Sequence, residues 1–238
     1  MAYFKNFPKV LYSFGDGNVA AMKDLTVYAE VIDEIKNNGS YYSSYYIMDG
    51  ERPDQVAFKL YKNAELHWTL YLLNDSIRDL GWPMKTLDVI EKVKTDYPGL
   101  VLRTTDEIFD KFKVGTQVRG NISGAEGTVA FRDLNLGHVV LEDVTGSFIA
   151  DELVGEIGTD KTITILSATP EHLAPRIHLN ADGEEVDYDQ FTPDGEFITE
   201  VSQQDYYISQ NDKQRQITVL RPDVVNQVVL AFRDAVKQ

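Results

Sequence analysis

The sequence predicts an α+β fold in which a strand–helix–helix unit with a helical extension carries an inserted small antiparallel β-barrel. Two changes of pattern lead to this prediction. Apolar residues recur at three- and four-residue steps across much of residues 21–112, which is typical of helices. Residues 113–168 instead consist of short β-type runs between closely spaced glycines, and residues 213–238 return to a strand followed by a helical pattern.

Residues 1–20 are predicted to form an extended arm without a core of its own. Aromatic side chains lie on both sides of Pro8 and are followed by the sequence Gly-Asp-Gly. Aromatic residues on such an arm bury themselves either in the body of the protein or in a partner. The arm therefore supplies four candidate interface residues, which are Phe4, Phe7, Tyr12 and Phe14.

The strand–helix–helix unit is predicted within residues 21–112. Residues 40–48 (SYYSSYYIM) are rich in aromatic and hydroxyl side chains and end at an Asp-Gly pair, which indicates a strand and a turn. Pro53 suits the first turn of a helix, because the N–H that proline lacks is not needed there. The helices predicted from the apolar step span residues 24–37, 53–62, 65–73 and 86–94.

The inserted barrel is predicted over residues 113–168. Eight of the sixteen glycines fall between Gly115 and Gly158. Regularly spaced turn residues with short alternating runs between them are typical of a small antiparallel barrel. The β-type runs cover residues 117–122, 127–131, 138–141 and 162–166.

An acidic segment over residues 169–212 follows the predicted barrel. Between Ile177 and Asp212 there are ten Asp and Glu residues and neither Lys nor Arg, so this stretch carries −10 of the net charge. Because it keeps several aromatic residues, it is predicted to be an irregular, partly packed loop or hairpin, with disorder as the alternative.

The C-terminal residues 213–238 are predicted to form a strand over 214–220 and then an amphipathic helix. Pro222 and the aspartate after it mark the start of that helix. Its apolar stripe provides further candidate interface residues, Val225, Val229 and Phe232.

Composition excludes several classes of function. The chain has no cysteine, which rules out disulfides, thiolate metal sites and a cysteine nucleophile. With 23 basic and 38 acidic residues the formal charge is −15, so nucleic acids and anionic membrane surfaces are unfavourable partners. No apolar run is long enough to span a membrane, and the N-terminal residues show no secretory signal.

No catalytic, cofactor or metal site is predicted. The four histidines lack metal-site spacing, and no phosphate-loop, dinucleotide or serine-nucleophile motif is present. The stretch HLNADGEEVDYD, residues 178–189, would place Asn180 and Asp182 at ligand positions of a calcium loop around Gly183. It puts a histidine at the first position and an aspartate at the last, so a solvated acidic turn is the alternative.

The stretch YYIMDGERPDQVAFKLYKNAELHWTLYLLND, residues 45–75, resembles the LysM-type module of the baseplate wedge proteins of T-even-like, contractile-tailed bacteriophages. The matching features are a Tyr-Tyr-Ile strand, an Arg-Pro helix start, Tyr61 two residues before Asn63, and a second helix with Trp68. A Gly-Trp-Pro follows soon after it. The spacing of Trp68 predicts a core position, whereas Arg52 and Trp82 are added to the candidate interface residues.

This resemblance implies a structural virion protein of the tail baseplate that is assembled in the host cytoplasm and is not an enzyme. Proteins of this family bind the wedge core, lie near the sheath-initiating protein, and clamp adjacent wedges into a sixfold ring. Aromatic and apolar anchors are what protein interfaces use, and the arm and terminal helix supply them. The predicted partners are therefore other baseplate wedge proteins.

A second interpretation takes the LysM resemblance literally, as a module that binds the N-acetylglucosamine glycans of peptidoglycan. Modules of this kind end in a second strand that pairs with the first. Here the segment after Asn74 continues into another helical pattern, and no catalytic residues accompany it. A calcium-dependent adhesive domain, resting on residues 178–189, is a third alternative.

Overall fold

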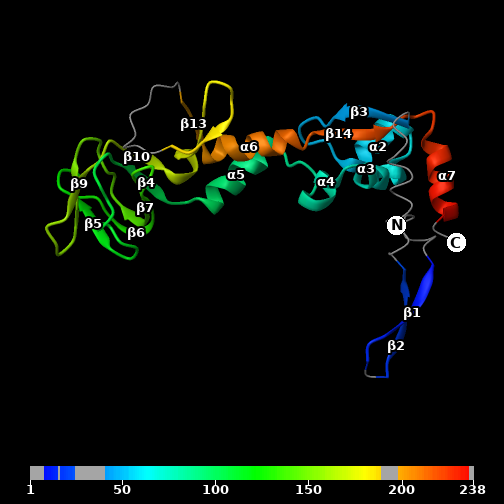
Figure 1. Cartoon of the computed structure of the whole chain (residues 1–238), viewed down its shortest axis with the longest axis horizontal. Helices are drawn as coiled ribbons and strands as arrows, with labels where there is room; N and C mark the ends of the chain where they lie inside the picture. The colour runs from blue at the N-terminus through cyan, green and yellow to red at the C-terminus, as the bar shows by residue number, and fades with distance from the viewer. Residues whose placement is uncertain (1–7, 16, 25–40, 189–197, 236–238) are drawn as a thin grey trace. The chain divides into compact units, whose positions relative to one another are not determined.

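The computed structural model describes residues 8–15, 17–24, 41–188 and 198–235. The chain divides into two compact units (Figure 1). Unit 1 comprises residues 1–85 and 211–238, and unit 2 comprises residues 86–210. The helix predicted over 24–37 and the candidates Phe4 and Phe7 lie outside the described residues.

The N-terminal segment is a β-hairpin rather than the predicted extended arm. Strand β1 (Lys9–Ser13) pairs antiparallel with β2 (Val19–Lys23). The Phe14 N–H donates a hydrogen bond to the Asn18 carbonyl (3.1 Å) and closes the turn. The Asp-Gly pair between two apolar runs is a hairpin signal that the arm interpretation overlooked.

Unit 1 contains the predicted strand and its helices. The predicted helices over 53–62 and 65–73 are confirmed, although the second begins as a 3₁₀ turn, and a further short helix follows it. The elements are β3 (Tyr42–Tyr46), α2 (Pro53–Tyr61), η3 (Ala64–His67), α3 (Trp68–Leu73), α4 (Asp75–Leu80), β14 (Gln216–Leu220) and α7 (Val225–Ala235).

The two strands of this part of unit 1 come from distant parts of the sequence. Strand β14 pairs antiparallel with β3, with Leu220 opposite Tyr42 and Gln216 opposite Tyr46. Along the chain of unit 1 the order is therefore strand, helix, helix, with a second strand supplied from beyond the insertion. A core cluster forms beside this sheet from Ile47, Val56, Leu70, Ile77, Ile217 and Val219.

Helix α7 covers a second cluster in unit 1. Its valines pack with Leu66 and Leu220, and the Phe232 ring lies 4.9 Å from the Trp68 ring. The predicted amphipathic stripe thus forms, and its apolar side faces the unit itself.

Unit 2 is built around a seven-stranded antiparallel sheet in the order β10-β4-β7-β6-β5-β8-β9. Only Ile165 and Leu166 separate β9 from β10, the two edge strands, so the sheet curls until its edges approach each other. The strands are β4 (Leu100–Arg103), β5 (Gln117–Gly120), β6 (Glu126–Asp133), β7 (His138–Thr145), β8 (Leu153–Glu156), β9 (Thr162–Thr164) and β10 (Ser167–Pro170).

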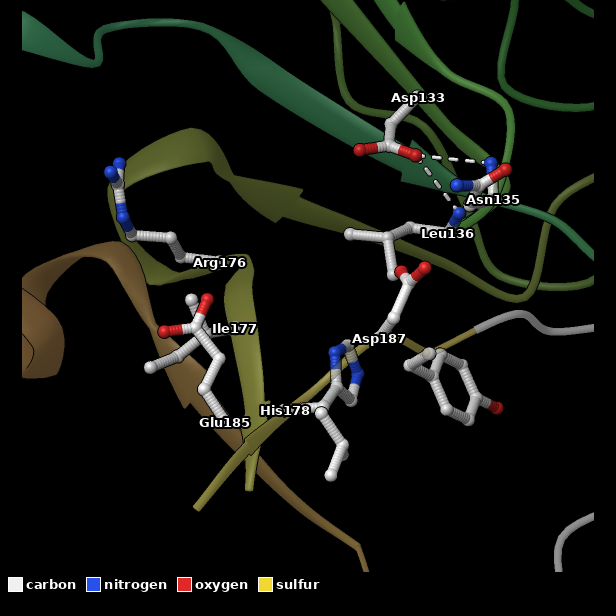
Figure 2. Close-up of a pocket in the computed structure, with 10 residues that line it drawn as sticks. Asp133, Asn135, Leu136, Arg176, Ile177, His178, Glu185 and Asp187 are labelled. Carbon is white, nitrogen blue, oxygen red and sulfur yellow. Dashed lines mark hydrogen bonds between the residues drawn. The ribbon is translucent and has the colours of Figure 1, made fainter. Parts of the chain in front are cut away.

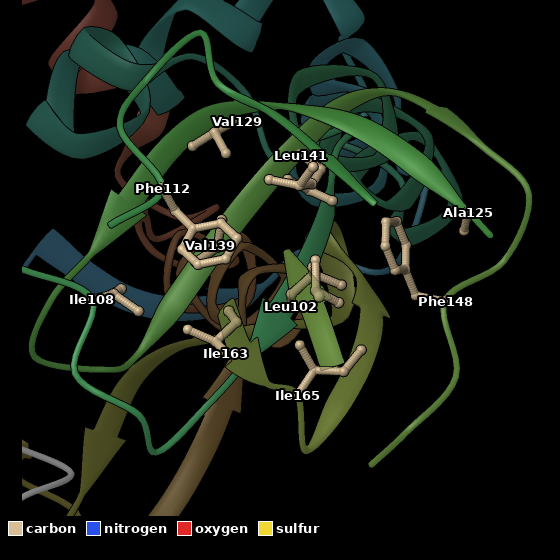
Figure 3. Close-up of a cluster of buried hydrophobic side chains, with 12 residues drawn as sticks. Leu102, Ile108, Phe112, Ala125, Val129, Val139, Leu141, Phe148, Ile163 and Ile165 are labelled. Atoms are coloured by element: carbon tan, nitrogen blue, oxygen red, sulfur yellow. The ribbon is translucent and has the colours of Figure 1, made fainter. Parts of the chain in front are cut away.

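The predicted barrel therefore needs two corrections. The sheet starts at β4 and ends at β10, outside both limits of the predicted range 113–168, and it is a half-barrel rather than a closed barrel. Its curl encloses a cluster of buried side chains (Figure 3). These include Leu102, Ile108, Phe112, Val129, Val139, Leu141, Phe148, Ile163 and Ile165.

The acidic segment of unit 2 is more regular than predicted. A three-stranded antiparallel sheet places β11 (Pro175–Leu179) between β12 (Glu185–Val186) and β13 (Thr199–Ser202). Helix α6 (Gln203–Lys213) then replaces the predicted loop, while residues 189–197 lie outside the described part. The remaining elements of this unit are α5 (Thr86–Asp96), which confirms the predicted third helix, and η4 (Glu171–Leu173).

Candidate interaction surfaces

The described residues hold no group of three or more metal-ligating side chains that could bind an ion. Among the helices of the described ranges, none combines the length and the apolar character needed to cross a bilayer. The search for a functional site therefore turns to pockets and exposed surfaces.

An open pocket of about 470 Å³ lies between the β6–β7 turn and the β11–β12 hairpin of unit 2. Figure 2 shows the residues that line it. Several of its polar side chains make contacts within the fold. The Asp133 carboxylate accepts hydrogen bonds from the backbone N–H groups of Asn135 and Leu136, both at 3.0 Å. The buried His178 ring stacks on Tyr188 with 4.4 Å between ring centroids. Nothing in this arrangement poises a group for catalysis.

The stretch considered as a calcium loop forms the turn of the β11–β12 hairpin. The Asn180 side-chain oxygen accepts hydrogen bonds from the backbone N–H groups of Asp182 and Glu184, at 3.0 and 2.9 Å. Strands flank this turn, in place of the helices of a calcium-binding helix–loop–helix. The structure therefore supports the acidic turn, the alternative that the sequence left open.

The β1–β2 hairpin presents apolar side chains on both of its faces. Directly opposed residues of an antiparallel pair share a face, and successive pairs alternate between faces. The tyrosine face consists of Val10, Tyr12, Ala20 and Met22, and the leucine face consists of Lys9, Leu11, Ser13, Val19, Ala21 and Lys23.

Both hairpin faces are exposed in the described structure. Leu11 is 78% exposed and Val19 59% on the leucine face, while Tyr12 is 54% exposed on the tyrosine face. The Phe14 ring contacts Tyr12 edge-on at 5.1 Å. An isolated two-stranded hairpin is only marginally stable, because it has no hydrophobic core in which its side chains can be buried.

The remaining predicted interface residues are engaged inside unit 1. The Trp82 indole N–H donates to the Glu51 carbonyl (2.6 Å), and its ring lies 5.8 Å from that of Tyr71. Arg52 caps α2, and its exposed side chain pairs with Asp54 at 3.1 Å. Three predicted residues are buried under α7, with exposures of 3 to 5%: Val225, Val229 and Phe232.

Burial of these three residues corrects the interpretation of the terminal helix as a partner-binding stripe. An amphipathic pattern shows that one face of a helix is covered, and here the cover is the helix's own unit. Within the hairpin, the sequence analysis missed four exposed apolar residues, Val10, Leu11, Val19 and Met22. Their signal was the alternation of two apolar strands around an Asp-Gly turn.

Glu51 organises the first turn of the strand–helix–helix unit. Its side chain is 6% exposed and forms an ion pair with Lys59. It also accepts hydrogen bonds from the Tyr45 hydroxyl (2.9 Å) and the Met48 N–H (3.0 Å). Burial alone would raise the pKa of the Glu51 carboxyl, but these donors outweigh burial and hold the pKa below its ordinary value of 4.5.

Acidification is therefore expected to destabilise unit 1 through Glu51. A carboxyl whose pKa is lower in the folded state stabilises the fold above its unfolded pKa and loses that contribution as the pH falls through the folded value. Both tryptophans lie in unit 1, so urea unfolding followed by tryptophan fluorescence measures this unit. The wild-type unfolding free energy should decline below about pH 4.5. A Glu51→Gln variant should decline less; equal slopes would contradict the role of Glu51.

Charge is distributed unequally between the two units. Counted over the sequence, unit 1 has 14 basic and 14 acidic residues, whereas unit 2 has 9 basic and 24 acidic residues. The whole net charge of −15 therefore lies in unit 2, and unit 1 is neutral. Unit 1 by itself adds no net charge to a contact, although the whole chain carries −15.

A comparison with protein families gives a match to part of the chain. Residues 8–92 match the family model described as Base plate wedge protein 53, which covers 85 of the 238 residues and runs from just before β1 into α5. No curated protein matches the sequence. The predicted resemblance to a phage baseplate wedge protein is confirmed over this range. The match supports a structural role in the baseplate, in the tail of the virion and in association with other baseplate proteins.

Proposed function

Because residues 8–92 match the base plate wedge protein 53 family, we propose that this chain is a non-enzymatic baseplate subunit that binds the wedge core and clamps neighbouring wedges together. One observation carries the clamping function. The β1–β2 hairpin, near the start of the matched range, exposes large apolar side chains on both of its faces, although the leucine face also carries Lys9, Ser13 and Lys23.

Two apolar faces require two covering surfaces. A strand pair that packs on a single surface keeps one face polar, and strands buried on both faces are apolar on both. The tyrosine face and the leucine face would each bury large side chains, so the hairpin fits between two surfaces of the assembly. An element inserted between two subunits joins them, and that is the action of a clamp.

The order of elements in unit 1 supports a LysM-like unit. Strand β3 is followed by α2 and α3, and β14 pairs with β3 as the second strand. The predicted strand over residues 214–220 is confirmed as β14, but its pairing with β3 was missed because the second strand was sought directly after Asn74. Its presence favours keeping peptidoglycan binding as the second candidate function. Sedimentation of the full chain with purified peptidoglycan tests that candidate, and retention in the supernatant would reject it.

Co-expression with the wedge-core proteins of the same phage, followed by size-exclusion chromatography, tests the proposed function. Two hairpin variants sharpen the test: Val10→Ser with Tyr12→Ser on the tyrosine face, and Leu11→Ser with Val19→Ser on the leucine face. Burying one large apolar side chain contributes about 1.5–3 kcal/mol, so each variant should weaken association at least about tenfold.

Leu230→Ser provides the matched control. Leu230 is 58% exposed on α7, so the same chemical change outside the hairpin should leave association unaltered. Loss of binding in only one of the two hairpin variants would indicate docking on a single surface and would contradict the clamp. Absence of wild-type association with every wedge-core protein would reject the proposed function itself.

A further inference from the structure

The two edges of the β3–β14 sheet are treated differently. On the outer edge of β14, the Asn74 side chain takes the place of a neighbouring strand. Its amide donates to the Thr218 carbonyl (2.7 Å), and its oxygen accepts a hydrogen bond from the Thr218 N–H (2.7 Å). Asn74 is 9% exposed, so this edge is closed to another strand.

The register shows which backbone groups of β3 point away from β14. Thr218 lies opposite Ser44 and turns its backbone groups away from β3, toward Asn74. In an antiparallel pair, opposed residues turn their backbone groups either both toward each other or both away from each other, so those of Ser44 point away from β14. Residues at odd-numbered positions of this segment instead bond to the partner strand, as the bonds at its two ends show: Ile47 N–H to Arg215 O (2.9 Å) and Arg221 N–H to Tyr41 O (2.8 Å). The N–H and C=O groups of Ser44 and Tyr46 therefore face outward.

Among the residues that the structure describes, this outer edge of β3 lacks the usual protection of an edge strand. Within the described residues the sheet has two strands, and residues 41–48 contain no charged residue and no proline. Natural edge strands are commonly guarded by lysine, by proline or by being very short. The seven-stranded sheet follows that rule, because β10 ends in Pro170 and β9 has three residues.

We propose that β3 accepts an extended segment of a different protein as a third strand of this sheet. The Ser44 and Tyr46 backbone groups would form the ladder, as in other cases of strand addition. The small exposed side chains of Ser43 and Ser44 leave room for larger cross-strand neighbours, and an uncharged strand suits an uncharged segment.

A second copy of this chain fits the edge less well. Each copy carries a net charge of −15, so pairing two copies through β3 would oppose two acidic molecules. A neutral or basic partner meets no such repulsion. The inferred contact also differs in kind from the hairpin, because it recognises main chain rather than apolar side chains. It does not depend on the clamping role of the hairpin.

Substitution at Ser44 tests the inference with the full chain. Ser44→Pro removes an outward N–H and leaves the bonds to β14 in place, and Ser44→Thr keeps the N–H as the matched control. Each baseplate protein of the same phage is tested separately for binding to wild type and to both variants. We expect one of them to bind Ser44→Pro at least tenfold more weakly and Ser44→Thr about as well as wild type.

Hydrogen exchange keeps the test decisive if Ser44→Pro fails to fold. In the free wild-type protein, the Ser44 and Tyr46 amides should exchange faster than those of Ser43 and Tyr45, and they should become protected in the complex. Protection in the free protein, no protection in any complex, or a Ser44-dependent homodimer by sedimentation would each overturn the proposal.

Binding that is lost in the hairpin variants and kept in Ser44→Pro rejects this inference alone. Ser44-dependent binding to a protein outside the wedge core, together with no wild-type association with any wedge-core protein, rejects only the wedge-core proposal.

Discussion

Replacing Glu152 by alanine is expected to destabilise unit 2 by about 3–4 kcal/mol, because each buried donor left without a partner costs about 1–3 kcal/mol. The Glu152 side chain is inaccessible to solvent. It accepts hydrogen bonds from the backbone N–H groups of Ser123 (2.9 Å), Ile122 (3.2 Å) and Ile149 (2.8 Å), and from the Ser123 hydroxyl (2.8 Å). One carboxylate thus ties two loops of the half-barrel together.

The surroundings of Glu152 favour its charged form. Burial alone would raise the pKa of this carboxyl, but the donors from Ser123, Ile149 and Ile122 outweigh burial and lower it. Gly120 leaves the necessary space, since a Cβ there would lie 2.6 Å from the Glu152 carboxylate and 2.4 Å from the Ser123 hydroxyl. The Glu152 carboxylate is therefore held by backbone N–H donors that no other side chain at residue 152 can satisfy equally.

Urea unfolding followed by circular dichroism measures this effect. Glu126→Ala is the matched control, because Glu126 is half exposed and its ion pair with Arg119, at 3.5 Å, should contribute less than about 1 kcal/mol. Tryptophan fluorescence reports on unit 1. In both variants the fluorescence transition should keep the urea midpoint of the wild type. A Glu152→Ala protein as stable as Glu126→Ala would show that water replaces the carboxylate without cost.

Local sequence signals predicted the elements that local chemistry determines. The aromatic and hydroxyl run around Tyr42 formed the predicted strand, and Pro53 began the predicted helix. Helix α6 was missed because its sequence, QQDYYISQNDK, has hardly any apolar stripe. Its Tyr207 ring packs edge-on against Tyr206, and it also contacts Tyr97, outside the helix, with which it shares a hydrogen bond of 2.7 Å.

Long-range pairing limited the prediction of the candidate surfaces. Nothing near Tyr42 in the sequence shows that Leu220 will lie opposite it, so neither the pairing of the predicted strand with β3 nor the open edge of β3 could be inferred. The apolar stripe of α7 was correctly found, yet its pattern could not say whether a partner or the chain itself covers it. Phe232 packs on Trp68, which supplies the answer.

Two asparagines join the parts of unit 1 that lie on either side of the insertion in the sequence. Asn74 bonds both backbone groups of Thr218, and it also donates to the Leu70 carbonyl (2.7 Å). Asn211 does the same to Met84, accepting from its N–H (2.8 Å) and donating to its carbonyl (3.0 Å). Each is 9% exposed. These bonds hold the two parts of unit 1 together, although the 125 residues of unit 2 separate them in the sequence.

Asn74→Leu is expected to destabilise unit 1 by about 2–3 kcal/mol, because leucine fills a similar volume and leaves the Thr218 and Leu70 backbone groups without their partner. Urea unfolding followed by tryptophan fluorescence gives the value. Asn226→Leu is the control, since Asn226 is exposed on α7 and leucine is a good helix former there.

Combining Asn74→Leu with Asn211→Leu should loosen β14 and α7 from the rest of unit 1. Limited proteolysis should then cut near residues 211–220 at a protease concentration that leaves the wild type intact, because cleavage requires local unfolding of the strand. Unit 2, whose core lies in the half-barrel, should remain uncut. If the double variant resisted proteolysis as the wild type does, pairing with β3 and packing under α7 alone would hold the distant strand, and the asparagines would be dispensable.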